Sequence, residues 1–342
     1  MAQVVSSESS IQQRGTEALW FVGGYTADMG GDAAGIGILA GRPDGSLELV
    51  GVAAEVASPS FLALDGDRVF AVAEGAGRLE AFTRTDATTL DYLGGAPVGG
   101  VEPCHVSVIG DTLIVSSYLS GSLGVIDAAS FDLVQVISGE GSGPHHVQEG
   151  PHAHATFALD DTTVLSADLG ADRIHVHWFE GGRLERTASL ELPAGSGPRD
   201  FARHPSGLVY VLAELSLQVL VLEYADARLA IIGSFPIPGA ETGDHAAGIS
   251  LTADGLFAYV ALRGSNRIAV FAVRDDGRTL DGISSVPSEG DWPRHHSLDG
   301  NLLHVANQKS GTVASFRIGE DGLPVLIATP TPVPSPTYLL RA

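Results

Sequence analysis

The chain of 342 residues contains a single cysteine, Cys104, so no internal disulfide can form. One free thiol is typical of proteins in a reducing compartment. The N-terminal segment has no basic stretch followed by an apolar one, as a secretory signal would. No apolar run approaches the roughly 18 residues that a membrane helix needs. We therefore expect a cytoplasmic protein that does not enter a membrane.

Positive charge is also scarce, since 19 Lys and Arg residues stand against 41 Asp and Glu residues, for a net charge of −22. Nucleic acids and anionic membrane surfaces are bound by basic faces, and the chain has no basic run. We expect neither partner and interpret the acidity as a solvated surface. In so acidic a chain, arginines gathered at one place would indicate a site for an anionic small molecule.

What the chain does have is a block that returns every forty-odd residues: a Pro- or His-containing turn, an apolar strand, and a polar residue where the strand ends. Such a period is typical of repeat architectures. The anchors of the seven blocks lie 44, 48, 47, 47, 48 and 43 residues apart, at Pro59, Pro103, Pro151, Pro198, His245, Pro293 and Pro336.

Each block divides into four short apolar runs separated by turn residues. The first block reads SFLALDG, DRVFAVAE, GRLEAFTR and TLDYLGGAPV. Runs of this length, rich in Val, Leu, Phe and Ala and without a helical period, predict strands joined by tight hairpins. Four antiparallel strands in about 45 residues make one propeller blade, so we predict an all-β, seven-bladed β-propeller. A β-sandwich is the alternative, but it does not require such regular internal similarity.

The two ends of the chain complement each other. The last anchor is followed by a single strand, SPTYLLRA, and the N-terminal part offers three more in ALWFVGGYT, GIGILAGRPDG and SLELVGVAAEVA. We predict that one blade is shared between the termini, which closes the ring and removes its exposed edges. Residues 18–342 would then form the propeller, and residues 1–17 a polar, flexible tail.

Polar residues vary at equivalent positions of the blades, whereas the framework recurs. In an antiparallel hairpin, the start of the first strand lies beside the end of the second, so both positions face one end of the ring. Variety there predicts a site built by several blades around the central opening. The alternative is that these groups only tie neighbouring blades together. The second strands end at Glu74, Tyr118, Asp168 with Leu169, Glu214, Arg263, and Asn307 with Gln308; the first strands begin with Ser60, Cys104, His105, His152, His154, Arg199, His245, Arg294 and His295.

At these residues the chain resembles the lactonase family of seven-bladed β-propellers, which includes 6-phosphogluconolactonases of the cycloisomerase-2 type and fungal 3-carboxy-cis,cis-muconate lactonising enzymes. The resemblance rests on the order and spacing of GGYT, PCHVSV, PHAH, DLGADRI, GPRDFARHPSG, ALRGSNRIAVF and ANQKSGTV. It implies working residues at His152 or His154, Arg199, Glu214 and Arg263. Three neighbours depart from the family pattern: Ser117 and Leu262, where Asn is usual, and Asp200, where His is usual.

The resemblance implies hydrolysis of a sugar lactone, expected to be 6-phosphogluconolactone of the pentose phosphate pathway. Opening a lactone needs a base for water, a group that holds the charge of the carbonyl oxygen, and an anchor for a remote anion. We predict Glu214 as the base, with the His152–His154 pair as the alternative, and His154 as the group that polarises the carbonyl. Arg199 and Arg263 would grip the anion, assisted by Arg294. The remaining predicted substrate contacts are His105, His245, Glu74, Tyr118, Asn307 and Gln308.

Three other readings stay open. A muconate-type cycloisomerase would run lactone closure with much the same residues, and a non-enzymatic propeller would serve as an interaction scaffold. The histidines His145, His146, His152 and His154 also have the composition of a metal site, although the resemblance implies chemistry without a metal or other cofactor. Oligomeric state, monomer or dimer, is not specified by the sequence. A serine hydrolase is not expected, because the pentapeptide G-x-S-x-G is absent.

Overall fold

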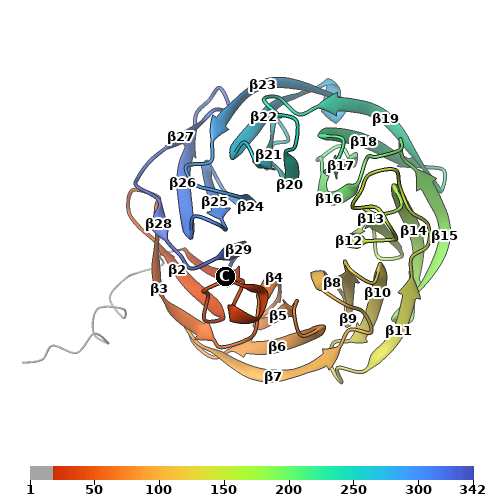
Figure 1. Cartoon of the computed structure of the whole chain (residues 1–342), viewed down its shortest axis with the longest axis horizontal. Helices are drawn as coiled ribbons and strands as arrows, with labels where there is room; N and C mark the ends of the chain where they lie inside the picture. The colour runs from red at the N-terminus through yellow and green to blue at the C-terminus, as the bar shows by residue number, and fades with distance from the viewer. Residues whose placement is uncertain (1–17) are drawn as a thin grey trace, which may run out of the picture.

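A computed structural model describes residues 18–342 and shows seven four-stranded blades arranged around a central opening (Figure 1). The predicted all-β seven-bladed propeller is confirmed. Apart from strands, the described residues form two short 3₁₀ turns, η2 (Ala27–Met29) and η3 (Asp275–Gly277). The tail predicted for residues 1–17 lies outside the described part of the chain.

Every blade is an antiparallel meander whose first strand lines the centre of the ring. From the centre outward, the first four blades are β4 (Pro59–Asp65), β5 (Arg68–Ala73), β6 (Arg78–Arg84) and β7 (Leu90–Pro97); β8 (Pro103–Ile109), β9 (Thr112–Ser117), β10 (Ser122–Asp127) and β11 (Leu133–Ser138); β12 (Ala153–Ala158), β13 (Thr163–Asp168), β14 (Arg173–Glu180) and β15 (Arg183–Glu191); and β16 (Pro198–Arg203), β17 (Val209–Ala213), β18 (Gln218–Ala225) and β19 (Arg228–Pro236).

The remaining three blades complete the circle. They are β20 (His245–Leu251), β21 (Phe257–Arg263), β22 (Arg267–Arg274) and β23 (Thr279–Pro287); β24 (Pro293–Asp299), β25 (Leu302–Asn307), β26 (Thr312–Ile318) and the interrupted outer strand β27 (Pro324–Leu326) and β28 (Thr331–Pro332); and β29 (Pro336–Arg341), β1 (Leu19–Gly24), β2 (Ile36–Gly41) and β3 (Leu47–Ala54).

The last blade joins the two ends of the described chain, as the sequence predicts. β29 is its innermost strand and pairs with β1, with Phe21 opposite Leu340 and Trp20 opposite Arg341. Figure 1 shows the C-terminus next to β29, within the same blade as β2 and β3. The backbone pairing of β29 with β1 closes the ring of blades, so that no blade lacks a neighbour on either side.

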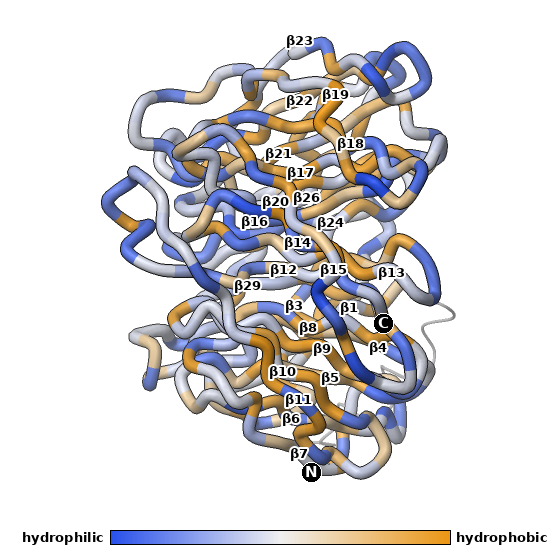
Figure 2. Tube along the Cα trace, turned by 90° about the vertical axis from the view of Figure 1, so that its right-hand side faces the viewer, coloured by the Kyte–Doolittle hydropathy of each residue, from blue (hydrophilic) through white to orange (hydrophobic). Residues whose placement is uncertain are grey.

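The apolar core lies between the faces of neighbouring blades. Middle strands carry the most apolar segments, and loops carry the polar ones (Figure 2). The buried tyrosines Tyr210 and Tyr259 occupy matching positions in consecutive blades, and their hydroxyls donate at 2.9 Å to the carbonyls of Gly277 and Gly322. Burying one large apolar side chain stabilises a fold by about 1.5–3 kcal/mol, so the repeated interfaces supply the rigidity on which a central site depends.

A β-bulge follows the first residue pair of each innermost strand except β20, where it follows the second pair. In β16, for example, Pro198 pairs with Ala213 and Asp200 with Leu212, so that Arg199 between them has no partner. A bulge bends the strand and redirects the unpaired side chain. The bulged residues are Ser60, Cys104, His154, Arg199, Arg294, Thr337 and, in the two-residue bulge of β20, Ala247 with Gly248.

The third block begins two residues later than its sequence anchor suggests. β12 starts at Ala153, which pairs with Asp168 as Pro103 pairs with Ser117, so Pro151 is not the equivalent of Pro103. The longer connection before β12 is fixed by Gln148, whose amide donates to the Leu169 carbonyl at 2.8 Å and to Asp172 at 2.7 Å. This offset decides that His154, and not His152, is the bulged residue.

Candidate active site

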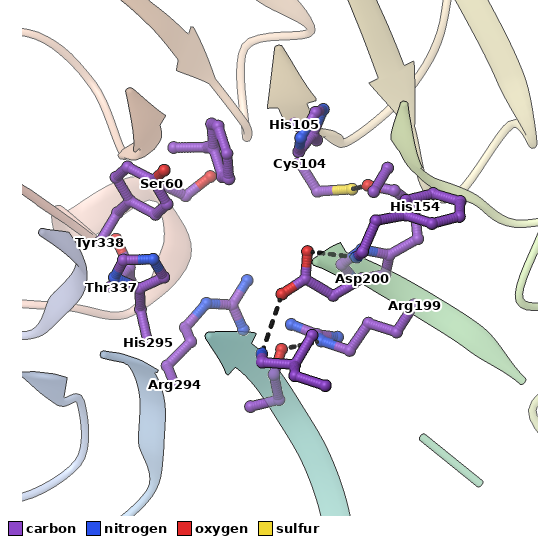
Figure 3. Close-up of a pocket in the computed structure, with 15 residues that line it drawn as sticks. Ser60, Cys104, His105, His154, Arg199, Asp200, Arg294, His295, Thr337 and Tyr338 are labelled. Atoms are coloured by element: carbon purple, nitrogen blue, oxygen red, sulfur yellow. Dashed lines mark hydrogen bonds between the residues drawn. The ribbon is translucent and has the colours of Figure 1, made fainter. Parts of the chain in front are cut away.

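The bulged residues form the upper of two tiers around a central cavity of about 270 Å³. In each strand, the residue that directly follows the bulge belongs to the lower tier. Figure 3 shows Arg199, Arg294 and Asp200 pointing into the opening. The upper tier contains Ser60, Cys104, His154, Arg199, Ala247, Arg294 and Thr337, and the lower tier contains Phe61, His105, Ala155, Asp200, Ile249, His295 and Tyr338.

Residues that follow the second strands border the same end of the ring. Pro59 pairs with Ala73 and Pro198 with Ala213, which places Glu74 and Glu214 beside the bulges. The alignment of second and third strands made from the sequence is confirmed, because Ala73 pairs with Arg78 in one blade as Ala213 pairs with Gln218 in another.

Glu214 is the centre of a buried cluster of charges. One carboxylate oxygen, Oε2, lies 2.8 Å from Nη1 of Arg199. The other, Oε1, lies 2.8 Å from Nη2 of Arg263 and 3.0 Å from Nδ1 of His245. Both guanidinium groups are fixed further, because Arg199 Nε donates to the Ala247 carbonyl at 2.6 Å and Arg263 Nε to the His245 carbonyl at 3.3 Å. We call Glu214, Arg199, Arg263 and His245 the Glu214 cluster.

The pKa values of this cluster follow from burial and mutual attraction. Burial alone would raise the pKa of Glu214, but the guanidinium groups of Arg263 and Arg199 outweigh it and hold the pKa well below its ordinary value. Burial lowers the pKa of Arg263 to about 9. Both carboxylate oxygens are already occupied by Arg199, Arg263 and His245, so this geometry does not favour the predicted role of Glu214 as the group that activates water.

A second acid–arginine group lies on the other side of the opening. The hydroxyl of Tyr25 lies 3.0 Å from each carboxylate oxygen of Glu74. Nη2 of Arg294 is 3.8 Å from Glu74 Oε2, and its guanidinium lies 5.0 Å from the centre of the Tyr25 ring. We call Tyr25, Glu74 and Arg294 the Glu74 cluster.

The two histidines of the H-x-H segment take different places. His154 lines the cavity, where burial and then the charge of Arg199 lower its pKa well below the usual value. His152 stacks on Tyr118 with ring centres 4.4 Å apart, and its Nδ1 lies 2.8 Å from the Tyr118 carbonyl oxygen. His152 therefore holds Tyr118, while His154 faces the opening as a neutral imidazole.

The lower tier is aromatic and uncharged apart from one acid. His105 packs against Phe61 with ring centres 4.4 Å apart, and burial lowers its pKa to about 3. His295 packs against Tyr338 at 4.0 Å, and burial lowers its pKa well below the usual value. Asp200 accepts hydrogen bonds from the backbone N–H groups of Phe201 and Ile249, while burial raises its pKa. Such a floor does not attract an anion.

Asn307 and Gln308 are not brought to the cavity, although the sequence predicts both as substrate contacts. Asn307 is fully buried and its amide donates to the Ser288 carbonyl at 2.9 Å, so it supports a connection between blades. Gln308 lies in the turn after β25, where its backbone N–H donates to the Trp292 carbonyl. Neither residue lines the cavity, and both are corrections of the sequence-based prediction. The other predicted site residues that do not line it are His152, His245, Glu74, Tyr118, Glu214 and Arg263.

The proposed histidine metal site is not assembled within residues 18–342, where no three His, Cys, Asp or Glu side chains come together as metal ligands. His145 and His146 stack on each other at 4.2 Å on the connection before β12, whereas His152 is occupied with Tyr118. Over the same residues, no helix is long and apolar enough to cross a membrane.

Comparison with known proteins identifies the family of the chain. The family model described as "Lactonase, 7-bladed beta-propeller" matches residues 20–340. The chain belongs to this lactonase family. It is therefore a member of an enzyme family, which favours the enzymatic reading over a pure interaction scaffold.

Within the lactonase family, the 6-phosphogluconolactonase of Bacillus subtilis strain 168 is 31 % identical over 306 residues, which cover 83 % of this chain and 87 % of that protein. A periplasmic gluconolactonase of Pseudomonas aeruginosa superposes with a TM-score of 0.87 at 28 % identity, over 96 % of this chain and 99 % of that one. A Lactobacillus plantarum protein gives 0.89 at 28 % identity, over 96 % and 100 %.

Some residues of this lactonase-family site escaped the sequence reasoning. Tyr25 belongs to the GGYT segment, and the only sequence feature that pointed to it was the place of this segment among the motifs shared with the family. Trp292 and Lys309 form a cation–π pair beside Arg263, which we call the lip. Lys309 Nζ lies 3.3 Å from the centre of the Trp292 ring, and the Arg263 guanidinium lies 5.4 Å from it. Lys309 is the only lysine of the chain, which is a signal that composition alone offers.

Proposed function

We propose that this protein hydrolyses 6-phosphogluconolactone to 6-phosphogluconate, as a step of the pentose phosphate pathway, at the central cavity. The observation that carries the proposal is that Arg199 and Arg294 line one cavity of a chain whose net charge is −22, with Arg263 joined to Arg199 through Glu214. Guanidinium groups bind phosphate and stabilise oxyanions. The name of the Bacillus subtilis relative supports the same substrate.

Arg199 is suited to the charge that develops on the lactone carbonyl oxygen. Its Nε and Nη1 atoms are bound to Ala247 and Glu214, and within residues 18–342 its Nη2 has no hydrogen-bond partner. A donor fixed before the reaction begins stabilises a developing oxyanion without reorganisation. Neutral His154, from the neighbouring bulge, remains our candidate for a second polar contact to the carbonyl.

His245 is suited to the role of the base. Its Nδ1 donates to Glu214 Oε1 at 3.0 Å, which leaves the lone pair on Nε2. We propose that Nε2 takes a proton from water while the water oxygen attacks the lactone carbonyl carbon. Nε2 then returns the proton to the ring oxygen as the carbon–oxygen bond of the ring breaks. Glu214 stabilises the transient imidazolium, as a carboxylate does in a triad.

The test is hydrolysis of 6-phosphogluconolactone by the full chain and by His245→Gln. Loss of a general base lowers kcat by about 10²- to 10⁴-fold. His146→Gln is the matched control, because His146 is exposed and, unlike His245, makes no hydrogen bond to Glu214. Absence of turnover by the wild-type protein would contradict the proposed function. Turnover that His245→Gln leaves unchanged would reject His245 as the base and retain the lactonase.

We also propose a cytoplasmic location, and we keep the cycloisomerase as the alternative activity. Carboxymuconate offered under the same conditions tests the cycloisomerase alternative, which no contact in the cavity favours over hydrolysis. The cytoplasmic location rests on the sequence alone, and the Pseudomonas aeruginosa relative is described as periplasmic.

A further inference from the structure

Arg294 differs from the other two arginines of the site in how little the protein holds its guanidinium. It donates no hydrogen bond to any residue from 18 to 342, and its nearest carboxylate oxygen, on Glu74, is 3.8 Å away. Its side chain is 18 % exposed and lines the cavity. Donors that are oriented by the fold and left without partners are available to a ligand.

Tyr25 explains why Arg294 is not drawn onto Glu74. Its hydroxyl lies 3.0 Å from both carboxylate oxygens, on the side where a guanidinium would otherwise make a two-pronged contact. Burial raises the pKa of Tyr25, so the phenol stays neutral and continues to donate. The Tyr25 ring also supports the guanidinium of Arg294 by a cation–π contact at 5.0 Å. Glu74 is therefore shared, and Arg294 is positioned without being neutralised at close range.

The rest of the cavity leaves the upper tier as the place for an anion. The lower tier offers Asp200, which repels an anion when ionised, and the neutral imidazoles of His105 and His295. Arg199 and Arg263 are joined to Glu214 at 2.8 Å. Arg294 lines the cavity, but within the described chain its guanidinium has no carboxylate oxygen closer than 3.8 Å.

We propose that Arg294 is the anchor for the phosphate monoester of the substrate, with Tyr25 and Glu74 as the residues that position it. Arg199 and Arg294 come from the bulges of β16 and β24, which lie on either side of β20 around the same cavity. A lactone ring between them would present its carbonyl to Arg199 and its phosphate to Arg294. The inference rests on the proposed function and adds selectivity for a phosphorylated lactone.

Binding of the stable reaction product tests this anchor without requiring turnover. Isothermal titration calorimetry compares 6-phosphogluconate with gluconate on the full chain. We expect the wild-type protein to bind the phosphorylated ligand more tightly. In Arg294→Lys, which keeps the charge but loses the planar fork, affinity for 6-phosphogluconate falls roughly 10- to 100-fold, while affinity for gluconate stays within about twofold. Arg278→Ala, which removes an exposed arginine paired with Glu223, is the control.

Tyr25→Phe provides a second variant that does not alter the arginine. Without the hydroxyl, both oxygens of Glu74 are open to Arg294, so the guanidinium closes onto the carboxylate. We expect KM for 6-phosphogluconolactone to rise about 5- to 20-fold, and KM for unphosphorylated gluconolactone to rise much less.

Equal wild-type affinity for 6-phosphogluconate and gluconate would overturn the inference, as would wild-type affinities in folded Arg294→Lys. Failure of the proposed function looks different, because then the wild-type protein hydrolyses neither lactone whatever the calorimetry shows. Should Arg294→Lys fail to fold, judged by circular dichroism, calorimetry of Tyr25→Phe decides the question in its place. A phosphate preference as large as in the wild type would then reject the anchor.

Discussion

The two acid–arginine clusters of the cavity contain the same residue types and differ in how they are joined. In the Glu214 cluster, two guanidinium groups and one imidazole contact a single carboxylate at 2.8–3.0 Å. In the Glu74 cluster, a tyrosine hydroxyl contacts the carboxylate at 3.0 Å, and the guanidinium remains at 3.8 Å. The first arrangement satisfies its charges internally, whereas the second leaves a cation directed at the opening.

The comparison of the two clusters shows that an arginine in a cavity is not by itself a binding site for an anion. A guanidinium joined to a carboxylate at close range has lost much of its attraction for a ligand, although its remaining N–H groups are well oriented for an oxyanion. A guanidinium that lacks such a partner keeps both its charge and its fork. Lactone hydrolysis needs a rigidly held donor for the carbonyl oxygen and a separate cation that binds the remote anion, and the two clusters provide one each.

The largest effect should come from breaking the Glu214 cluster. Glu214→Gln removes the charge that compensates two buried guanidinium groups, so we expect a loss of about 3–5 kcal/mol in the free energy of unfolding. Urea denaturation followed by circular dichroism measures it. Glu223→Gln, in an exposed pair with Arg278, should change stability by about 1 kcal/mol or less. Comparable losses in both variants would contradict the compensating role of Glu214.

The same cluster should make stability sensitive to acid. Because the pKa of Glu214 in the folded protein is below its ordinary value of 4.5, its contribution is fully present above that pH and is lost as the pH falls further. The stability difference between wild type and Glu214→Gln should therefore be constant near neutrality and shrink below about pH 4.5. Denaturation at a series of pH values checks this, and a difference that grows on acidification would refute it.

A smaller effect should sharpen the role of the Glu74 cluster. Glu74→Gln removes the carboxylate that competes with a ligand for Arg294, so affinity for 6-phosphogluconate should rise about two- to fivefold, as expected for a pair that is 3.8 Å apart and not hydrogen-bonded. Calorimetry at fixed ionic strength measures the change. Weaker binding would show that Glu74 holds Arg294 in place more than it competes for it.

The smallest effect is expected at Cys104, which lies in the upper tier between the two clusters. Its thiol is buried and directed at the backbone carbonyls of Ala153 and His154. Burial raises the pKa of this thiol to about 12, so the folded protein should resist alkylation by iodoacetamide at pH 8 and react only when unfolded. Cys104→Ala should change stability by about 1 kcal/mol and leave kcat unaltered. Rapid alkylation of the native protein would contradict the buried placement.

Sequence reasoning succeeded where the repeat carries the information. The period gives the blades, the ends give the closure between β29 and β1, and the alignment of third strands places Glu74, Glu214 and Arg263 at one end of the ring. All of these depend on backbone pairing, which is alike in every blade. Of the predicted site residues, His105, His154, Arg199 and Arg294 line the cavity itself.

What the sequence did not supply depends on features that break the repeat. The connection before β12 shifts its start by two residues, which only the packing of Gln148 reveals. Which arginine pairs with Glu214 and which lies near Glu74 depends on side-chain directions that the bulges set. Tyr25 holds Glu74 from a loop that precedes the first complete blade, 49 residues away in the chain. Polar variation at Asn307 signals a connection between blades and not a ligand contact.

A crystal structure of the protein with 6-phosphogluconate tests the division of the cavity most directly. We predict that the phosphate lies within hydrogen-bonding distance of Arg294, in the upper tier, and that the C1 carboxylate lies beside Arg199 and His154. A phosphate bound between Arg199 and Arg263, or at the lip formed by Trp292 and Lys309, with Arg294 still 3.8 Å from Glu74 and free of the ligand, would contradict it.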